Sequence, residues 1–161
     1  MLSSISYTIV ESLVGDLIIY GTESSLMGVG FLRLRDWTKE RETWVEQPEA
    51  YREIIGQLQG YFSGTLKRFE MPISLSGTEF QPSVYRQLIN IPYGETRSYS
   101  DIAEAIGNKK AVRAVGNANS KNPIAIIVPC HRVIGRDGSL TGFAGGIEAK
   151  KILLRLENAA S

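Results

Sequence analysis

The stretch RSYSDIAEAIGNKKAVRAVGNANSKN, residues 97–122, decides how the C-terminal half of this chain folds. Ser98 precedes Asp101 by three residues, which is the spacing of a capping box at the start of a helix, and Gly107 is a residue type that commonly ends one. Asn108 is a suitable N-cap for a second helix. The inner face of that helix is expected to consist of Ala111, Val112, Ala114, Val115 and Ala118. Two short helices joined by a Gly-Asn turn predict a helix-turn-helix.

The distribution of charge favours an anionic partner for this half of the chain. Residues 1–78 contain 7 basic and 10 acidic residues, a net charge of −3, whereas residues 79–161 contain 11 basic and 7 acidic residues, a net charge of +4. No acidic residue occurs between Glu104 and Asp137. The basic residues in that window are Lys109, Lys110, Arg113, Lys121, Arg132 and Arg136. Nucleic acid is the first candidate partner, and a solvated basic surface is the alternative.

The N-terminal half has the pattern of a small sheet with one helix. Three short runs, ISYTIV, DLIIYG and LMGVGFL, alternate apolar and polar residues between turn signals, which is typical of an antiparallel meander. A helix is predicted over residues 48–64, ending at Gly64, and a further short strand over 70–75. The apolar residues of this helix at helical spacing are Tyr51, Ile54, Ile55, Leu58, Tyr61 and Phe62.

The remaining helices complete an α+β fold of two domains. One helix is predicted before Pro92 and Gly94, with an apolar stripe made of Phe80, Val84, Leu88 and Ile91. A last amphipathic helix after residue 146 directs Ile152, Leu153 and Leu156 inward. We therefore expect a sheet domain over residues 1–76 and a mostly helical domain with the helix-turn-helix over residues 77–161.

The run IAIIVPCHRVIGRDG, residues 124–138, contains the only cysteine and the only histidine of the chain. One cysteine excludes an internal disulfide, so Cys130 is either an inert buried thiol or a reactive one. A neighbouring imidazole can activate a thiol by accepting its proton. Consecutive side chains of a strand point to opposite faces, so Cys130 and His131 can cooperate only where the chain leaves the strand, as Pro129 permits, or through a water. Glu157 is a candidate to orient the imidazole.

Several short motifs around this pair resemble the O6-alkylguanine-DNA alkyltransferases, the methylated-DNA protein-cysteine methyltransferases. They are PCHRVIG at 129–135, Asn122-Pro123, RAVGNAN at 113–119, SYSDIA at 98–103 and GFAGG at 142–146. The resemblance covers residues 79–158 in continuous register, and the N-terminal half is loosely similar to the family's ribonuclease-H-like domain. It implies minor-groove binding, base flipping, and transfer of the alkyl group of O6-alkylguanine, and of O4-alkylthymine, to Cys130. A thioether product has no good leaving group, so each molecule is expected to react once, without a cofactor.

The resemblance also implies a role for each residue of the reaction. Cys130 would be the nucleophile, and His131 would be the base that acts through a water. Glu157 would orient His131, and Tyr99 would protonate the departing guanine. Asn122 would link the recognition helix to the active-site segment through hydrogen bonds.

By the same resemblance, Arg113 would fill the place of the flipped base and Gly116 would allow close approach to DNA. The full set of expected DNA contacts is Arg113, Val112, Gly116, Lys121, Ser98 and Tyr99. The expected pocket residues are Val128, Pro129, Val133, Phe143, Ala144 and Gly145. Phe143 would lie against the base and the N–H of Ala144 would face the guanine oxygen. The backbone carbonyls of Val128 and Cys130 would accept hydrogen bonds from the exocyclic amine of the guanine.

Two departures from the family and two alternative functions are also apparent in the sequence. The structural zinc of some members needs cysteines that this chain lacks, so no metal is expected, and Ala144 stands where many relatives carry serine. The alternatives are a turnover Cys-His hydrolase and a non-catalytic helix-turn-helix regulator. No apolar run is long enough to span a bilayer and no signal peptide is recognisable, so we expect a cytoplasmic, nucleoid-associated monomer. The expected partner is double-stranded DNA with alkylated guanine, and cooperativity along DNA is left open.

Overall fold

The computed structural model describes residues 4–141, 143 and 145–158. The chain divides into two compact units, Met1–Ser74 and Leu75–Ser161. The boundary predicted from the sequence, between residues 76 and 77, lies two residues further along. Strands and one long helix make up the first unit and helices dominate the second, which is the α+β class that the sequence predicts.

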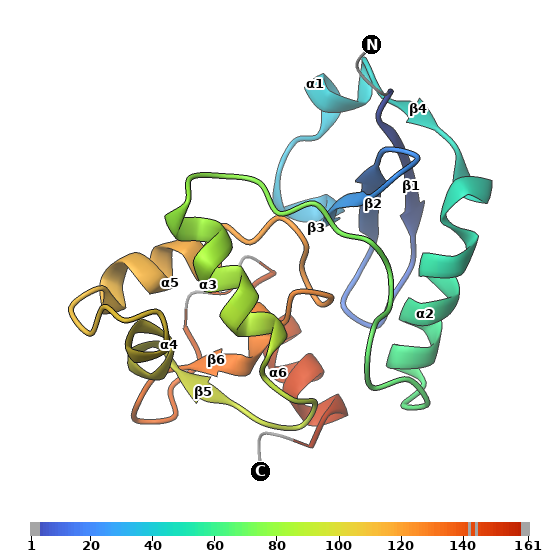
Figure 1. The fold of residues 1–161 in the computed structure, drawn as a ribbon. Coiled ribbons are helices and arrows are strands. Elements are labelled where there is room, and N and C mark those ends of the chain that lie inside the picture. Colours follow the sequence, from blue (N-terminus) through green and yellow to red (C-terminus); the bar gives the residue numbers. More distant parts are fainter. Residues whose placement is uncertain (1–3, 142, 144, 159–161) are drawn as a thin grey trace. The chain divides into compact units, whose positions relative to one another are not determined.

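The first unit is built on a four-stranded sheet with the order β3-β2-β1-β4 (Figure 1). Its strands are β1 (Ser6–Val10), β2 (Leu17–Gly21), β3 (Leu26–Phe31) and β4 (Val45–Glu46). The first three pair antiparallel, as their alternation predicts, and β4 pairs parallel with β1. The strand predicted over residues 70–75 is reduced to one parallel bridge between Leu26 and Ile73.

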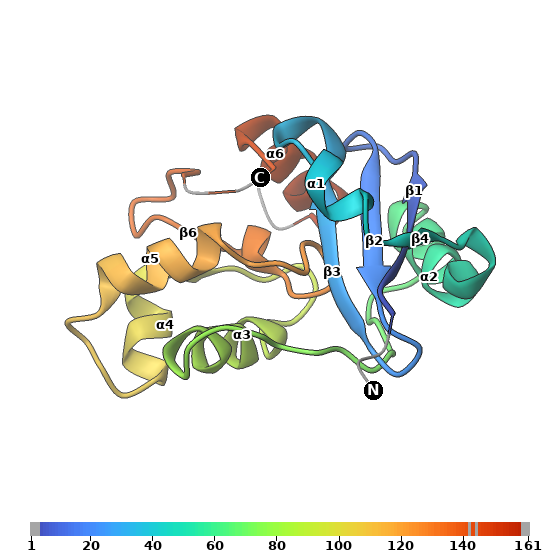
Figure 2. The same ribbon diagram turned by 90° about the horizontal axis from the view of Figure 1, so that it is seen from above.

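One helix and a cluster of aromatic residues pack on this sheet. Helix α2 (Arg52–Phe62) follows the 3-10 turn η2 (Pro48–Tyr51) and lies beside β1 in both views (Figures 1 and 2). It ends as predicted, because Gly64 adopts φ +82°, a conformation that other residues rarely take. The aromatic cluster is centred on Tyr7, Ile18 and Trp37. The shorter helices are η1 (Leu32–Leu34) and α1 (Thr38–Arg41).

The second unit groups three helices around the core of the C-terminal half. Its elements are α3 (Phe80–Ile89), β5 (Arg97–Ser98), α4 (Tyr99–Ala105), α5 (Val112–Ser120), η3 (Cys130–Arg132), β6 (Val133–Ile134) and α6 (Ile147–Leu156). Helices α3, α4 and α5 contact one another. The short strands β5 and β6 pair in parallel, and β5 leads directly into α4 (Figure 1).

Helices α4 and α5 form the predicted helix-turn-helix, with one correction at the turn. The capping box is present, since Asp101 N–H donates to Ser98 Oγ at 3.0 Å and Ser98 N–H donates to Asp101 Oδ2 at 2.9 Å. Asn108 is not the N-cap of α5, which begins at Val112 after Ala111. Its backbone closes the turn instead, because its N–H donates to Ala103 O and its carbonyl accepts from Ala111 N–H.

The inner face of α5 also differs from the prediction. Val115 and Ala118 are buried as expected, but Val112 and Ala114 are exposed. The later start of the helix shortens its packed face to its C-terminal part. There the polar residue Asn119 is fully buried, at a position that the apolar pattern did not indicate.

None of the helices within residues 4–141, 143 and 145–158 is long and apolar enough to cross a membrane.

Candidate active site

The run IAIIV that precedes the cysteine is buried but forms tight turns instead of a strand. Ile126 adopts φ +72°, and Ile127 N–H donates to Ala125 O at 2.8 Å across it. Pro129, at φ −80° and ψ +65°, is the centre of an inverse γ-turn in which Cys130 N–H donates to Val128 O at 2.8 Å. The chain then enters η3, where neighbouring side chains no longer point to opposite faces. The departure from strand geometry that the Cys-His pair requires is therefore present.

Cys130 is a fully buried thiol, with 1% of its surface exposed. Burial raises the pKa of Cys130 to about 11, while a hydrogen bond with the side chain of Asn122 and the charge of Lys150 act to lower this pKa. Asn122 lies directly after α5, and its Nδ2 also donates to Val128 O at 2.8 Å. The thiol is thus protonated at rest, and a base is needed to activate it.

His131 forms a buried hydrogen-bonded pair with Glu157, the residue expected from the sequence to orient the imidazole. His131 Nε2 lies 2.7 Å from Glu157 Oε2, and both side chains are completely buried. Burial is the largest effect on the pKa of His131 and lowers it, although Glu157 opposes this. A neutral imidazole that donates from Nε2 presents Nδ1 as its acceptor, which is the form a general base needs.

Arg132 completes this network, although sequence reasoning had assigned it only to the basic window. Its Nε donates to Glu157 Oε1 at 2.8 Å and its Nη2 donates to Oε2 at 3.1 Å, a bidentate pair. Nη1 donates to Ile91 O at 2.7 Å, and Gly94 N–H donates to Glu157 Oε1 at 3.3 Å. The Arg132 guanidinium and a backbone N–H therefore hold the Glu157 carboxylate in this buried position by the hydrogen bonds that they donate to it.

Lys150 is a second buried cation that the sequence analysis missed. Its side chain is 0% exposed, and Nζ donates to Val133 O at 2.5 Å and to Thr141 O at 3.0 Å. Burial lowers the pKa of Lys150 to about 8, and the charge of Cys130 acts to raise it. The helical register could have indicated it, since Lys150 is three and four residues before the buried Leu153 and Leu154.

Tyr99 stands at the start of α4, close to the thiol and to Lys150. Its hydroxyl donates to Thr141 O at 2.7 Å, and Lys150 Nζ lies 5.9 Å from the centre of its ring. Burial is the main cause of the raised pKa of Tyr99, to which the charge of Cys130 also contributes. A Cβ at Gly116 of α5 would lie 3.8 Å from Tyr99 Cδ1, so the recognition helix passes directly beside this ring.

The remaining residues predicted for the site divide into an exposed and a buried group. Arg113, Val112 and Lys121 are exposed on or at the end of α5, and the hydroxyl of Ser98 is engaged in the helix cap. The predicted pocket residues that are buried are Val128, Pro129, Val133, Phe143 and Gly145. Ala144 lies outside the described residues. The structure thus places a solvent-exposed helix face and a buried reactive centre on the same short segment, 112–133.

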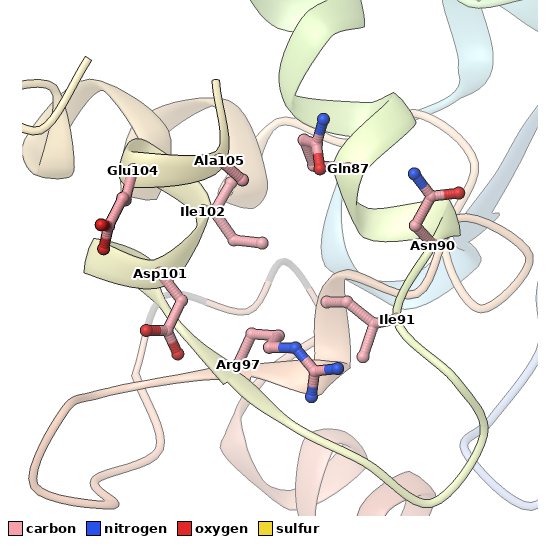
Figure 3. Close-up of a pocket in the computed structure, with 8 residues that line it drawn as sticks. All are labelled: Gln87, Asn90, Ile91, Arg97, Asp101, Ile102, Glu104 and Ala105. Carbon is pink, nitrogen blue, oxygen red and sulfur yellow. The ribbon is translucent and has the colours of Figure 1, made fainter. Parts of the chain in front are cut away.

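A surface hollow between α3 and α4 adjoins this network, because its lining residue Ile91 accepts a hydrogen bond from Arg132 through its carbonyl (Figure 3). Its lining includes Gln87, Asn90, Arg97, Asp101 and Glu104. Two of its charged groups are engaged locally, because Asp101 caps α4 and Arg97 pairs with Glu95 at 3.1 Å. In the described part of the chain, no three His, Cys, Asp or Glu side chains are grouped so that they could hold a metal ion.

A helix-turn-helix that ends at Ser120, together with a buried centre of Cys130, His131 and Glu157, defines a class of DNA-binding protein with a cysteine nucleophile. The family models of 6-O-methylguanine DNA methyltransferase match the whole of this arrangement, the ribonuclease-like domain at residues 5–75 and the DNA binding domain at residues 79–159. The chain belongs to this family.

Individual relatives are similar to this chain over nearly its full length. A methylated-DNA–protein-cysteine methyltransferase of Methanosarcina acetivorans is 51% identical over 95% of this chain and 98% of its own. One of Mycolicibacterium paratuberculosis is 50% identical over 98% of this chain and 94% of its own. The crystal structure of Mycobacterium tuberculosis O6-methylguanine methyltransferase matches with a TM-score of 0.90 at 46% identity, covering 98% of this chain and 94% of that one. The structure of that organism's protein in complex with DNA matches with a TM-score of 0.89 at 46% identity, covering 97% and 94%.

Proposed function

We propose that this protein repairs DNA by moving the alkyl group of O6-alkylguanine, and of O4-alkylthymine, onto Sγ of Cys130, once per molecule. The observation that carries the proposal is the buried Cys130 beside the His131–Glu157 pair, directly after a helix-turn-helix. The names of the relatives and the DNA complex of the Mycobacterium tuberculosis protein support it.

The proposed reaction starts with removal of the thiol proton. Nδ1 of neutral His131 takes this proton through a water, and Glu157 stabilises the imidazolium that forms. The thiolate attacks the alkyl carbon, so that the sulfur–carbon bond forms as the carbon–oxygen bond of the base breaks. The departing guanine anion takes a proton from Tyr99, whose raised pKa keeps it protonated at neutral pH.

On the DNA side, we propose that α5 enters the minor groove of the duplex. Arg113 would fill the gap left by the flipped base, and Gly116 would permit close approach of the helix. Ser98, Val112 and Lys121 would contact the backbone nearby. Because this helix lies beside Tyr99 and leads directly to Asn122, binding of DNA and filling of the pocket are expected to be linked.

The proposal extends to the state of the protein in the cell. We infer that it acts as a monomer in the cytoplasm, associated with the nucleoid. Residues 77–161 would bind DNA and react, and residues 1–76 would support them. Sedimentation of the protein on duplexes of increasing length would show whether molecules bind independently or cooperatively.

The decisive experiment is the intact mass of the protein after incubation with a duplex that contains O6-methylguanine. One added methyl group on Cys130, with product that stops at one equivalent, is expected, and Cys130→Ala should gain no mass. Continued product formation after the first equivalent would support a hydrolase. A regulator would be supported if the unaltered protein and Cys130→Ala bound DNA equally well and neither changed in mass.

A further inference from the structure

Asn119 is a buried polar residue of the recognition helix that has no role in the reaction described above. It lies in the last turn of α5, and its side chain is 0% exposed. Its Nδ2 donates a hydrogen bond to the backbone carbonyl oxygen of Cys130 at 3.2 Å. The helix that carries Arg113 is thus connected to the peptide group that joins Cys130 to His131.

The carbonyl of Cys130 has a second donor, which is close to it in the chain. The N–H of Val133 donates to this oxygen at the end of η3. A carbonyl oxygen has two lone pairs, so Asn119 and Val133 together occupy it. It has no acceptor position left for the guanine amine that the family resemblance assigned to it. Its two hydrogen bonds instead fix the orientation of the peptide group between Cys130 and His131.

The amide of Asn119 is explained by this donor and not by its oxygen. Asn119 Oδ1 is buried and has no hydrogen-bond partner among the residues that the structure describes. A buried amide oxygen without a donor destabilises a folded protein, whereas leucine has a similar size and carries no such cost. The position therefore carries an amide because its Nδ2 donates to Cys130 O.

The peptide group between Cys130 and His131 determines how the two reactive side chains face each other. Because a peptide bond is planar, the backbone between the two Cα atoms can rotate only at ψ of Cys130 and φ of His131. The direction of the Cys130 carbonyl fixes the first of these angles. The imidazole itself is held at Nε2, which lies 2.7 Å from Glu157 Oε2. A rotation of this peptide group would therefore move the thiol relative to His131 Nδ1.

The end of α5 that carries Asn119 is fixed to its surroundings. The hydroxyl of the buried Tyr85 donates to Ala118 O at 3.0 Å. Asn122, three residues after Asn119, donates from Nδ2 to Val128 O at 2.8 Å. The two amides thus hold the carbonyls on both sides of the intervening proline turn. Asn119 is held firmly enough to set the direction of the carbonyl that follows this turn.

We propose that Asn119 is a positioning residue that orients the peptide group between Cys130 and His131, so that the imidazole can take the thiol proton. Asn119 does not touch the alkylated base in this proposal. It acts from the recognition helix, through the backbone, on the proton transfer that activates the nucleophile. The inference rests on the function proposed above.

The experiment measures single-turnover rates of methyl transfer to Cys130, from a duplex with O6-methylguanine, at saturating protein and between about pH 7 and about pH 9.5. The proteins are the unaltered chain, Asn119→Leu, Asn119→Ala and Asn117→Leu. Asn117 is exposed on the same helix, so the last variant is the matched control. The melting temperature of each protein and its affinity for an unmodified duplex are measured as well.

At about pH 7 both Asn119 variants should react about three- to tenfold more slowly than the unaltered protein, the effect of one hydrogen bond. This loss should shrink as the pH rises. Because the pKa of Cys130 is about 11, its thiolate becomes about tenfold more abundant with each pH unit and depends less on the imidazole. Affinity for the unmodified duplex should not change. Asn119→Leu should melt at an equal or higher temperature because the unpaired oxygen is gone, and Asn117→Leu should behave as the unaltered protein does.

The other ionisable groups around the reactive pair are the same in all four proteins. Those that interact with Cys130 or His131 are Tyr85 on α3, Tyr99 on α4, Arg132 on η3, Lys150 on α6, and Glu157. Their titration affects all four rates alike. The ratio of two rates at one pH therefore reports on Asn119.

Three outcomes would overturn the inference. The first is an unchanged rate in both Asn119 variants at about pH 7. The second is a loss of rate that is equal at every pH, or a loss of folding in both variants, because either result assigns Asn119 a structural role alone. The third is a loss of rate that is matched by weaker binding of the unmodified duplex. Absence of methylation of the unaltered protein would instead contradict the proposed function.

Discussion

Replacing Glu157 by glutamine should strongly destabilise this protein, because one buried carboxylate compensates a buried guanidinium. Glu157 accepts hydrogen bonds from His131 Nε2, from Nε and Nη2 of Arg132, and from Gly94 N–H. The side chains of Arg132 and Glu157 are 8% and 0% exposed. Removing one partner of such a pair leaves an uncompensated buried charge and lowers the free energy of unfolding by about 3–5 kcal/mol. For a chain of this size the melting temperature should fall by about 6–20 °C.

A double-mutant cycle measured by urea unfolding tests the physical reason for this loss. Arg132→Met alone leaves the carboxylate without its cation, and the double variant removes both charges. The double variant should therefore lose less free energy of unfolding than the two single variants together, by about 1–3 kcal/mol. Glu148→Gln, which breaks the exposed pair with Lys151 on α6, should change stability by less than about 0.5 kcal/mol. Strictly additive losses in the cycle would refute the reasoning.

The remaining predictions concern Lys150, Tyr99 and Arg113. Because burial lowers the pKa of Lys150 from 10.5 to about 8, the folded protein releases this proton at a lower pH than the unfolded chain does. The free energy of unfolding of the unaltered protein relative to Lys150→Met should thus rise by about 2 kcal/mol between about pH 7.5 and pH 10, and a constant difference in urea unfolding would contradict this. Tyr99→Phe should slow methyl transfer in single-turnover assays more than it weakens DNA binding, and an unchanged rate would remove Tyr99 as the proton donor. Arg113→Ala should reduce repair of duplex DNA but spare the reaction with a free O6-alkylguanine, so equal losses on both substrates would count against a role in base flipping.

The parts of the fold that follow from local pattern were predictable from the sequence. Alternation along β1, β2 and β3 indicated the sheet, and Gly64 and Gly107 marked the ends of two helices. The capping box of α4 was equally clear, since all its groups lie within four residues. In each case the determining interactions are between residues that are close in the chain.

The parts that depend on distant contacts were not predictable. Asn108 has the right residue type for an N-cap, but its backbone is used to close the turn. The apolar run before Cys130 does not distinguish a strand from a buried loop, because both require apolar side chains. Arg132 lies 25 residues from Glu157, so nothing local in the sequence indicates the bidentate pair. The register of α6 indicates that Lys150 is buried, but the backbone carbonyls that accept from Lys150 and from Asn119 leave no trace in the sequence.

The depth at which Cys130 lies has a consequence for the product of its reaction. The thiol is 1% exposed, and the buried Ile126 before it already adopts φ +72°, an unfavourable angle for a β-branched residue. Extra bulk in a filled core destabilises a protein by about 1–3 kcal/mol. The methylated protein should therefore have a lower melting temperature than the unreacted protein. A repaired lesion would thus be recorded as a loss of stability in the protein molecule that accepted its methyl group.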